Sequence, residues 1–462
     1  MFNIDFIFGA STASYQIEGS IDKDGKTSSI WDTFTKTKEN ILDGSDGSIV
    51  CDSYVKYKDD VKLLHELGVK AYRFSIAWSR VIDKNNNPNQ KGLDYYTNLC
   101  KELRKYNIKP YVTLYHWDMP QWLEDIGGFL NDEISNYFMH YTDVVTKALD
   151  GYVSDYITIN EPQCIMFLGH RLCVHAPGVK YNDKEMLKAI HNLLLCHGKS
   201  VKIIRKNVKN STVGFAPCSR PMIPTTNDQL LYKKCYEEYY KLDRDNEYPN
   251  NVSIYSDPVF LGDYPKEYYE KFKDILPKIT KEDLELINQP IDYIYQNFYS
   301  GTFYSLDKDN NSVKEPFSFG YPEGNIDWLQ VVPQTLYYGP KYLYERYKKT
   351  IIISENGFCN NDVLSLDGNV HDPERIDYIK RYLIELNKVS KEIPVLGYFY
   401  WSLFDNFEWN SGLKKRFGLV YIDYRNGNRI KKDSFYEYKN IIETGVIKWL
   451  NSLKYLINLI LL

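Results

Sequence analysis

Two glutamates, Glu161 and Glu355, each follow a short apolar run with the composition of a buried β-strand. The first run, Tyr156–Pro162 (YITINEP), stops abruptly at Asn160, Glu161 and Pro162. Because Pro162 has no N–H for a sheet ladder, strand pairing should end there and leave the Glu161 carboxylate at the strand tip. Glu355 follows the run TIIIS in the same way. One such glutamate can be a solvated loop residue, but two carboxyls in one pocket have divergent pKa values, as acid–base chemistry requires.

Apolar runs recur eight times along the chain, and most are followed by a helical pattern. The predicted strands are Phe6–Ala10, Ala71–Ile76, Pro110–Tyr115, Tyr156–Ile159, Thr212–Ala216, Tyr293–Asn297, Thr350–Ser354 and Val395–Trp401. The predicted helices are Ser53–Leu67, Gly92–Tyr106, Glu133–Asp150, Lys184–Lys206, Tyr337–Lys348 and Pro373–Val389, with Gly68 and Asn107 as left-handed caps.

This alternation predicts the α/β class and a single (β/α)8 TIM barrel, with long active-site loops at 217–290 and 302–336. A doubly wound open sheet is the alternative. No GxGxxG follows the first strand, however, and eight units is the number that closes a barrel.

Polar and aromatic residues lie at the end of every predicted strand except the fifth, with Arg73 inside the second strand. They are Gln16, Arg73, His116, Trp117, Asn160, Glu161, Asn297, Tyr299, Glu355, Trp401, Glu408 and Trp409. In a parallel barrel these strand ends meet at one rim, where ligands bind. Amides and carboxylates suit the hydroxyl groups of a sugar, and indole rings suit its apolar face.

The paired glutamates fit the cleavage of a glycosidic bond. One carboxylic acid protonates the leaving oxygen while a carboxylate attacks or screens the anomeric carbon. Arg73 and Tyr299 are candidate partners that keep one glutamate charged. We expect no metal ion and no cofactor, since the chain has no HxH or HExxH motif and no zinc-type cysteine spacing.

Segments along nearly the whole chain carry a more specific pattern. They read FGASTASYQIEG (8–19), YRFSIAWSR (72–80), HWDMPQWL (116–123), TINEP (158–162), HAPG (175–178), SENG (354–357), YWSLFDNFEW (400–409) and KRFGLVYID (415–423). From about residue 6 to Ile442 the chain resembles the family 1 glycoside hydrolases, the β-glucosidase family. Two departures are Cys173, where the family usually has Gly, and Phe298, where Tyr is usual.

The resemblance implies a role for each matching residue. Glu161 would be the general acid/base and Glu355 the nucleophile, which forms a covalent glycosyl-enzyme with retention of configuration. Arg73, Asn297 and Tyr299 would assist them. The residues assigned to substrate binding are Gln16, His116, Trp117, Asn160, Trp401, Glu408, Trp409 and Phe417, with Trp328 at the aglycone entrance.

The implied function is that of a retaining β-glycosidase, β-glucosidase-like, acting on terminal non-reducing β-D-glycosides. A 6-phospho-β-glycosidase is the nearest alternative, but Glu408 would repel a phosphate, and Phe417 stands where such enzymes have a phosphate-binding Tyr. A transglycosidase would pass the sugar of the same intermediate to an alcohol. A non-catalytic sugar-binding protein is disfavoured because both glutamates are present.

Composition limits the partners and the compartment. A net charge of −4 without a basic stripe argues against nucleic acid, and eight scattered cysteines indicate reduced, mostly buried thiols. No signal-peptide pattern precedes residue 6, which predicts a cytoplasmic location. We expect residues 1–445 to form the catalytic domain. The amphipathic tail 446–462 should pack on the barrel or make a homo-oligomer contact rather than span a membrane or lie on its surface.

Overall fold

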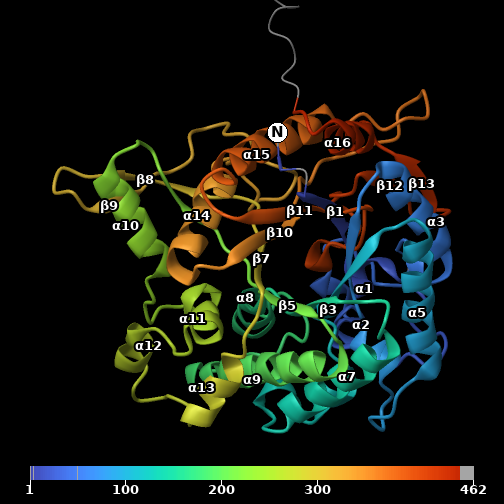
Figure 1. Ribbon diagram of the computed structural model, residues 1–462, viewed down its shortest axis with the longest axis horizontal. Coiled ribbons are helices and arrows are strands. Elements are labelled where there is room, and N and C mark those ends of the chain that lie inside the picture. The colour runs from blue at the N-terminus through green and yellow to red at the C-terminus, as the bar shows by residue number, and fades with distance from the viewer. Residues whose placement is uncertain (1, 4, 49, 448–462) are drawn as a thin grey trace, which may run out of the picture.

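A closed barrel of eight parallel strands forms the centre of the computed structural model, which describes residues 2–3, 5–48 and 50–447 (Figure 1). The strands are β1 (Ile7–Ser11), β2 (Ala71–Ser75), β3 (Lys109–Tyr115), β4 (Asp155–Asn160), β5 (Thr212–Ala216), β7 (Tyr293–Asn297), β10 (Thr350–Asn356) and β11 (Val395–Trp401). β1 pairs with both β2 and β11, which closes the sheet. The predicted (β/α)8 barrel is confirmed, and the open sheet is wrong.

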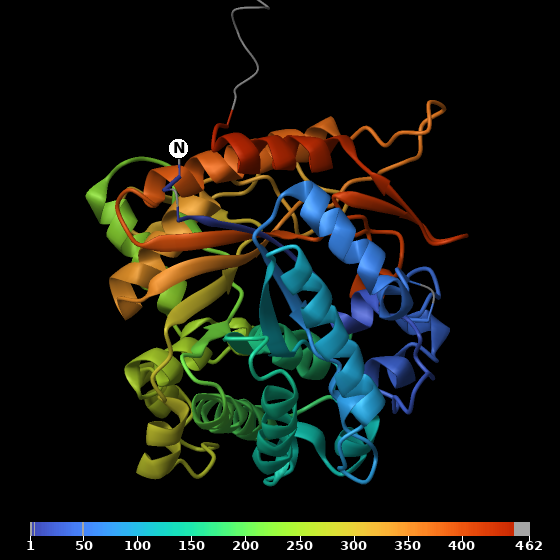
Figure 2. The ribbon, with the colours of Figure 1, turned by 45° about the vertical axis from the view of Figure 1, so that its right-hand side comes forward.

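Helices cover the outside of the barrel (Figures 1 and 2). The longer ones are α3 (Ser53–Leu67), α5 (Gln90–Lys105), α7 (Ile134–Ala148), α9 (Asp183–Asn207), α14 (Thr335–Tyr347), α15 (Pro373–Val389) and α16 (Asp433–Thr444). All six predicted helices are present, and Gly68 and Asn107 have the predicted left-handed φ values of 85° and 55°. The additional helix, α16, packs on the first strand, where the Tyr438 hydroxyl donates to the Gly9 carbonyl at 2.9 Å.

The two long segments predicted as active-site loops contain secondary structure of their own. Residues 217–290 include β6 (Met222–Pro224), α10 (Gln229–Tyr240), α11 (Ser253–Leu261), α12 (Lys266–Lys271) and α13 (Lys281–Ile287). Residues 302–336 include β8 (Thr302–Leu306) and β9 (Ser312–Lys314), which join β6 in a small sheet. The first segment is therefore more than a loop, because α11 and α13 lie against α9 on the outside of the barrel.

Short helices follow several strands at the rim of the barrel. They are α1 (Ser14–Ile17), α2 (Ile30–Phe34), α4 (Trp78–Val81), α6 (Gln121–Asp125) and α8 (Pro162–Met166), and the hairpin β12 (Val420–Asp423) and β13 (Asn428–Lys431) follows β11. The barrel interior is filled by large buried side chains, among them Tyr111, Tyr295 and Phe399. The rings of Tyr111 and Phe399 meet edge to face at 5.1 Å. Because the interior is packed, a site must lie above it, at the strand ends.

The last described helix, α16, ends at Thr444 and is capped by Gly445 with a φ of 64°. The predicted amphipathic tail falls outside the described residues from position 448 onward, so its docking and the boundary at 445 stay predictions. Within residues 2–3, 5–48 and 50–447, no helix combines the length and apolar character needed to cross a bilayer.

Candidate active site

Glu161 lies at a sharp turn between β4 and α8. Its φ of 44° is in the left-handed region, and its N–H donates to the Ala216 carbonyl at the end of β5 (2.7 Å). Pro162 then takes the first position of α8, where no helical hydrogen bond is required of it. The side chain is 7% exposed, and its Oε1 accepts a hydrogen bond of 2.7 Å from Asn297 Nδ2. The predicted end of pairing before Pro162 is confirmed.

Glu355 lies in β10, which runs two residues beyond its predicted end, to Asn356. Glu355 Oε1 accepts a hydrogen bond from Arg73 Nη1 (2.5 Å), and Oε2 accepts one from the Tyr299 hydroxyl (2.9 Å). Gly357 follows because a Cβ there would lie 1.7 Å from the Trp401 carbonyl oxygen. The close approach of β10 and β11 at this end therefore explains the glycine of the SENG segment.

Arg73 and Asn297 join the two glutamates in one hydrogen-bond network. The buried Arg73 donates from Nη2 to Asn160 Oδ1 (2.6 Å), and Asn297 Nδ2 donates to the same oxygen (3.1 Å) as well as to Glu161. Ser354 Oγ donates to Asn297 Oδ1 (2.7 Å), which orients that amide. The predicted partners of the two glutamates are therefore in contact with them.

The two carboxyl groups do not ionise alike. Burial and the charge of Glu355 raise the pKa of Glu161 to about 7. Burial also raises the pKa of Glu355, but Arg73 and the Tyr299 hydroxyl oppose the rise because they stabilise its ionised form. Glu355 is therefore the first of the pair to ionise, and Glu161 keeps its proton up to near neutral pH.

Of the buried polar atoms that have no hydrogen-bond partner among the described residues, three belong to predicted sugar-binding residues. They are Gln16 Oε1, His116 Nδ1 and Glu408 Oε2. Gln16 is oriented by its Nε2, which donates to the Phe407 carbonyl at 2.9 Å. Three such atoms on predicted sugar-binding residues are in keeping with a polar ligand at this place.

Glu408 and His116 are both mainly neutral near pH 7, because burial disfavours the charged form of each. Burial is the main cause that raises the pKa of Glu408 to about 8, and the charges of Glu355 and Glu161 add to it. Burial and the nearby Arg73 hold the pKa of His116 well below its usual value. Each residue can therefore exchange hydrogen bonds with hydroxyl groups without carrying charge.

Tryptophan side chains surround His116. Its ring is nearly parallel to those of Trp401 (5.8 Å between centroids) and Trp409 (6.0 Å), and Trp117 lies 5.4 Å away. Trp117 Nε1 also donates to the Asn160 carbonyl at 3.0 Å. These indoles supply the apolar faces that the sequence predicts beside the polar groups.

A second aromatic group lies outward from Glu355. Phe417 is buried, with its ring 6.1 Å from that of Tyr299 and 6.2 Å from that of Trp328. Trp328 is 42% exposed, in keeping with its predicted place at an entrance. Every residue predicted for the site therefore lies in this one region of the barrel rim.

Two cysteines beside Glu161 are missing from the predicted site. Cys164 is the third residue of α8 and Cys218 follows β5, yet their Sγ atoms lie 3.7 Å apart. Both sulfurs and a Glu161 carboxylate oxygen lie within 4.8 Å of one another. Sequence spacing gives no sign of this group, because 54 positions separate the two cysteines. The fifth strand, for which the sequence predicts no site residue, thus places Cys218 at the rim.

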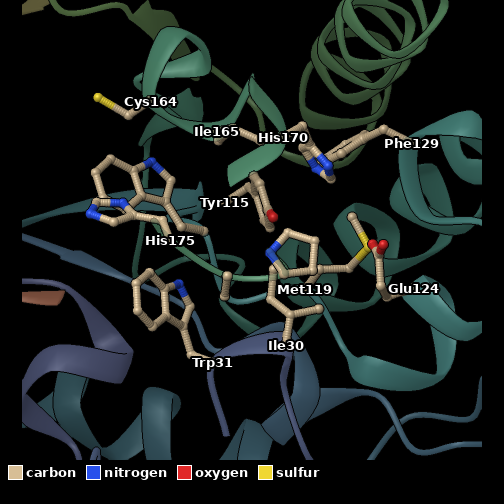
Figure 3. Close-up of a pocket in the computed structure, with 13 residues that line it drawn as sticks. Ile30, Trp31, Tyr115, Met119, Glu124, Phe129, Cys164, Ile165, His170 and His175 are labelled. Atoms are coloured by element: carbon tan, nitrogen blue, oxygen red, sulfur yellow. The ribbon is translucent and has the colours of Figure 1, made fainter. Parts of the chain in front are cut away.

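A small cavity adjoins this group (Figure 3). It is lined by aromatic and apolar side chains that include Trp31, Tyr115, Trp117 and His175. Cys164 lies at the edge of the cavity, and Figure 3 shows its sulfur directed away from Tyr115. The Cys164 thiol therefore faces its neighbours at the rim rather than the cavity.

The departures from the family pattern do not alter these contacts. Phe298 is fully buried and packs on Gly339 of α14, where an added Cβ would lie 2.5 Å from its ring. The phenylalanine therefore changes packing behind the site. Cys173 is half-buried in a loop, with a φ of 58°.

Comparison with known proteins places the chain in a family. The model of glycosyl hydrolase family 1 matches residues 1–446. Beta-glucosidase A of Thermotoga maritima is 39% identical over 443 residues, which cover 95% of this chain and 97% of that protein. Beta-glucosidase A of Acetivibrio thermocellus is 39% identical over 459 residues, covering 96% and 98%. The T. maritima β-glucosidase solved with glucoimidazole matches with a TM-score of 0.87 and 38% identity, covering 96% of this chain and 98% of that one. The chain therefore belongs to glycosyl hydrolase family 1 and is a glycoside hydrolase.

Proposed function

We propose that the chain hydrolyses terminal non-reducing β-D-glucosides with retention of configuration, with Glu161 as the acid/base and Glu355 as the nucleophile. The observation that carries this assignment is the difference in hydrogen-bond partners between two carboxyl groups in one network. Glu355 accepts from the Arg73 guanidinium and the Tyr299 hydroxyl, whereas Glu161 accepts from the neutral amide of Asn297. Burial and the charge of Glu355 raise the pKa of Glu161 to about 7, in keeping with the role of an acid. The names of the similar β-glucosidases support the same glycone.

In the first step a Glu355 oxygen attacks the anomeric carbon. The bond from that carbon to the leaving oxygen breaks, and Glu161 transfers its proton to this oxygen. The products of the step are the free aglycone alcohol and a glycosyl ester on Glu355.

The ester changes the electrostatics in the direction that the second step needs. Once Glu355 is esterified it carries no charge, so one of the causes that raise the pKa of Glu161 disappears. Glu161, now ionised, takes a proton from water while the water oxygen attacks the anomeric carbon. The sugar leaves, Glu355 is again a carboxylate, and Glu161 is again protonated.

The remaining residues have positioning and binding roles in this proposal. Asn160 Oδ1 accepts hydrogen bonds from Arg73 and Asn297, which leaves its NH₂ group for His116 and for the sugar 2-hydroxyl. Gln16 Oε1, His116 Nδ1 and Glu408 Oε2 are available to the other hydroxyls, and Trp401 would lie under the apolar face of the ring.

A phosphorylated sugar suits this site less well. Glu408 Oε2 is buried, and the side chain forms no ion pair with a described cationic residue. A phosphate dianion at the 6-position would therefore lose its hydration beside Glu408 without gaining a cationic partner there, which would weaken its binding.

The test is the replacement Glu161→Gln, assayed on aryl β-D-glucosides with leaving groups of different acidity. The amide cannot donate a proton as an acid, so glycosylation of the enzyme by a substrate with a poor leaving group should slow by about 10²–10⁴-fold. For a dinitrophenyl glucoside, whose leaving group departs without a proton, the rate of this step should fall much less. Proton NMR of early product should show the β-anomer of glucose.

Glu102→Gln is the matched control, since Glu102 is also 7% exposed but pairs with Lys105 on α5. It should leave the rates unchanged. Equal losses of rate for good and poor leaving groups in Glu161→Gln, or the α-anomer as first product, would contradict the assignment.

Added methanol separates hydrolysis from transglycosylation, because a transglycosidase would release mainly methyl glucoside.

A further inference from the structure

The group formed by Cys164, Cys218 and Glu161 offers three metal-binding atoms at one point of the rim. The two sulfurs lie 3.7 Å apart, and a Glu161 carboxylate oxygen lies within 4.8 Å of both. Glu161 is buried, whereas the two cysteines are partly exposed and so open to a solvated ion. Sulfur and carboxylate ligands together suit a borderline-soft divalent ion such as Zn²⁺.

The separation of the sulfurs matches tetrahedral coordination. Two thiolates bound at about 2.3 Å to a tetrahedral Zn²⁺ lie about 3.8 Å from each other. The observed distance differs from this by only about 0.1 Å. A disulfide, by contrast, would need the sulfurs to approach to about 2.05 Å. A Glu161 carboxylate oxygen lies within 4.8 Å of both sulfurs, so it can serve as the third ligand.

The backbone holds all three ligands in place from different elements. Glu161 is fixed by its N–H bond to Ala216, and Cys164 lies on α8 directly after it. Cys218 is held by its N–H, which donates to Gln163 Oε1 (3.3 Å), and by a bridge to Asn297. Metal binding therefore needs little rearrangement of the chain.

The proton balance of the region is compatible with a cation. Of Glu161, Glu355 and Glu408, only Glu355 forms an ion pair with a described cationic residue, Arg73. A divalent ion bound to Glu161 would take the place of that carboxyl's proton. Each thiol releases its proton to solvent as its bond to the metal forms.

We propose that Cys164, Cys218 and Glu161 form an inhibitory binding site for a thiophilic divalent cation, with Zn²⁺ as the probe. Metal binding rests on the two thiols and the carboxylate alone. Inhibition rests in addition on the proposed function, because a Glu161 oxygen that binds the metal cannot hold the proton for the leaving group.

The experiment titrates chelator-treated enzyme with ZnCl₂ and follows aryl β-D-glucoside hydrolysis. The wild type should be inhibited by one Zn²⁺ per chain and recover with EDTA. Cys164→Ser and Cys218→Ser should each raise the concentration for half-inhibition at least tenfold relative to the wild type. Cys173→Ser is the matched control, a half-buried cysteine outside the group, and should behave as the wild type does.

A second measurement does not depend on turnover. Co²⁺ in place of Zn²⁺ should give the wild type a thiolate-to-cobalt charge-transfer band that disappears in the Cys164→Ser/Cys218→Ser double variant and persists in Cys173→Ser. Circular dichroism and the unfolding midpoint check that each variant is folded. The absorption spectrum of each protein with metal is compared with the spectrum of the same protein without metal. No band in the wild type, or a band unchanged in the double variant, would overturn the site.

The two proposals can fail separately. A cobalt band without zinc inhibition would refute the inhibitory role and count against Glu161 as the acid. A strong loss in Glu161→Gln together with no metal binding would leave the proposed function standing and refute this inference.

Discussion

Two groups of buried charges near the rim of the barrel differ in their balance. At the site, Glu161, Glu355 and Glu408 have one ion pair among the described residues, between Glu355 and Arg73. The second group, here called the salt-bridge cluster, pairs three acids with three bases after strands β10 and β11. Its members are Asp362, Asp372, Asp405, Arg375, Arg416 and Lys432.

The balance of charge reverses the direction of the pKa shift. Burial would raise the pKa of Asp362, but its ion pairs with Lys432 and Arg375 hold it below the ordinary value. Glu408 has acidic neighbours instead, and its pKa rises to about 8. Asp372 lies between these cases, since it shares Arg375 with Asp362 and its pKa is still raised by burial. The comparison teaches that burial alone does not set protonation. The site keeps a proton because it has few cations, whereas the cations of the salt-bridge cluster hold the pKa of Asp362 down.

The largest effect expected from this difference is on turnover. Glu355→Gln should reduce kcat by about 10⁴-fold or more, because no ester can form on the amide. Its unfolding midpoint should also fall, because the buried Arg73 loses the carboxylate with which it forms an ion pair. The assay is 4-nitrophenyl β-D-glucoside hydrolysis beside thermal unfolding. A stable variant with near-normal kcat would remove the nucleophile assignment.

The next effect is on stability, and it should fall on the other cluster. Asp362→Asn leaves Arg375 and Lys432 without a shared carboxylate and should lower the free energy of unfolding by about 3–5 kcal/mol. Urea denaturation measures this change, while kcat per folded molecule should stay close to that of the wild type.

The control for that change is Asp377→Asn, which removes an exposed ion pair with Arg381 and should have little effect. If Asp362→Asn lowered the free energy of unfolding by no more than Asp377→Asn does, the salt-bridge cluster would not stabilise the loops after β10 and β11.

The smallest effect is a change in how stability depends on pH. A carboxyl whose folded pKa exceeds its unfolded value binds more protons when folded, so Glu408 should weaken the fold as pH rises from about 4.5 to about 8. Glu408→Gln should remove this loss. At pH 8 the free energy of unfolding of the variant should therefore exceed that of the wild type by at least about 1 kcal/mol, since one pKa unit corresponds to 1.36 kcal/mol. Unfolding free energies of both proteins between pH 5 and pH 8 provide the measurement. Stability curves that stay parallel across this range would contradict the raised pKa.

Much of the fold was predictable because its signals are local. The bounds of β5, β7 and β11 match the predicted runs, and the capping residues Gly68 and Asn107 have the expected φ values. Helices α11, α12 and α13 are short, with 9, 6 and 7 residues, and α10 has tyrosine, which suits either face of a helix, at 4 of its 12 positions. Periodicity is therefore weak, and α11 and α13 pack against α9 while α10 packs on the small sheet.

The site shows the same limit. The residues at the strand tips were predictable because the barrel brings every strand end to one rim. The approach of Cys164 to Cys218 was not, since it depends on the turn at Glu161 and on the backbone path after β5. Likewise, the sequence shows the acidic residues near Asp362 and Asp405 but not that Lys432, far along the chain, lies between them.

The pairing of β1 with β11 has a consequence for synthesis on the ribosome. The strand that carries Glu161 emerges long before Trp401 and Glu408, and until β11 has been translated both β1 and β10 present unpaired edges. Nascent chains that stop before Val395 therefore have an open sheet that is prone to join other chains, and they lack the Trp401 and Glu408 side of the pocket. Catalytic competence arises only when the two ends of the translated barrel meet.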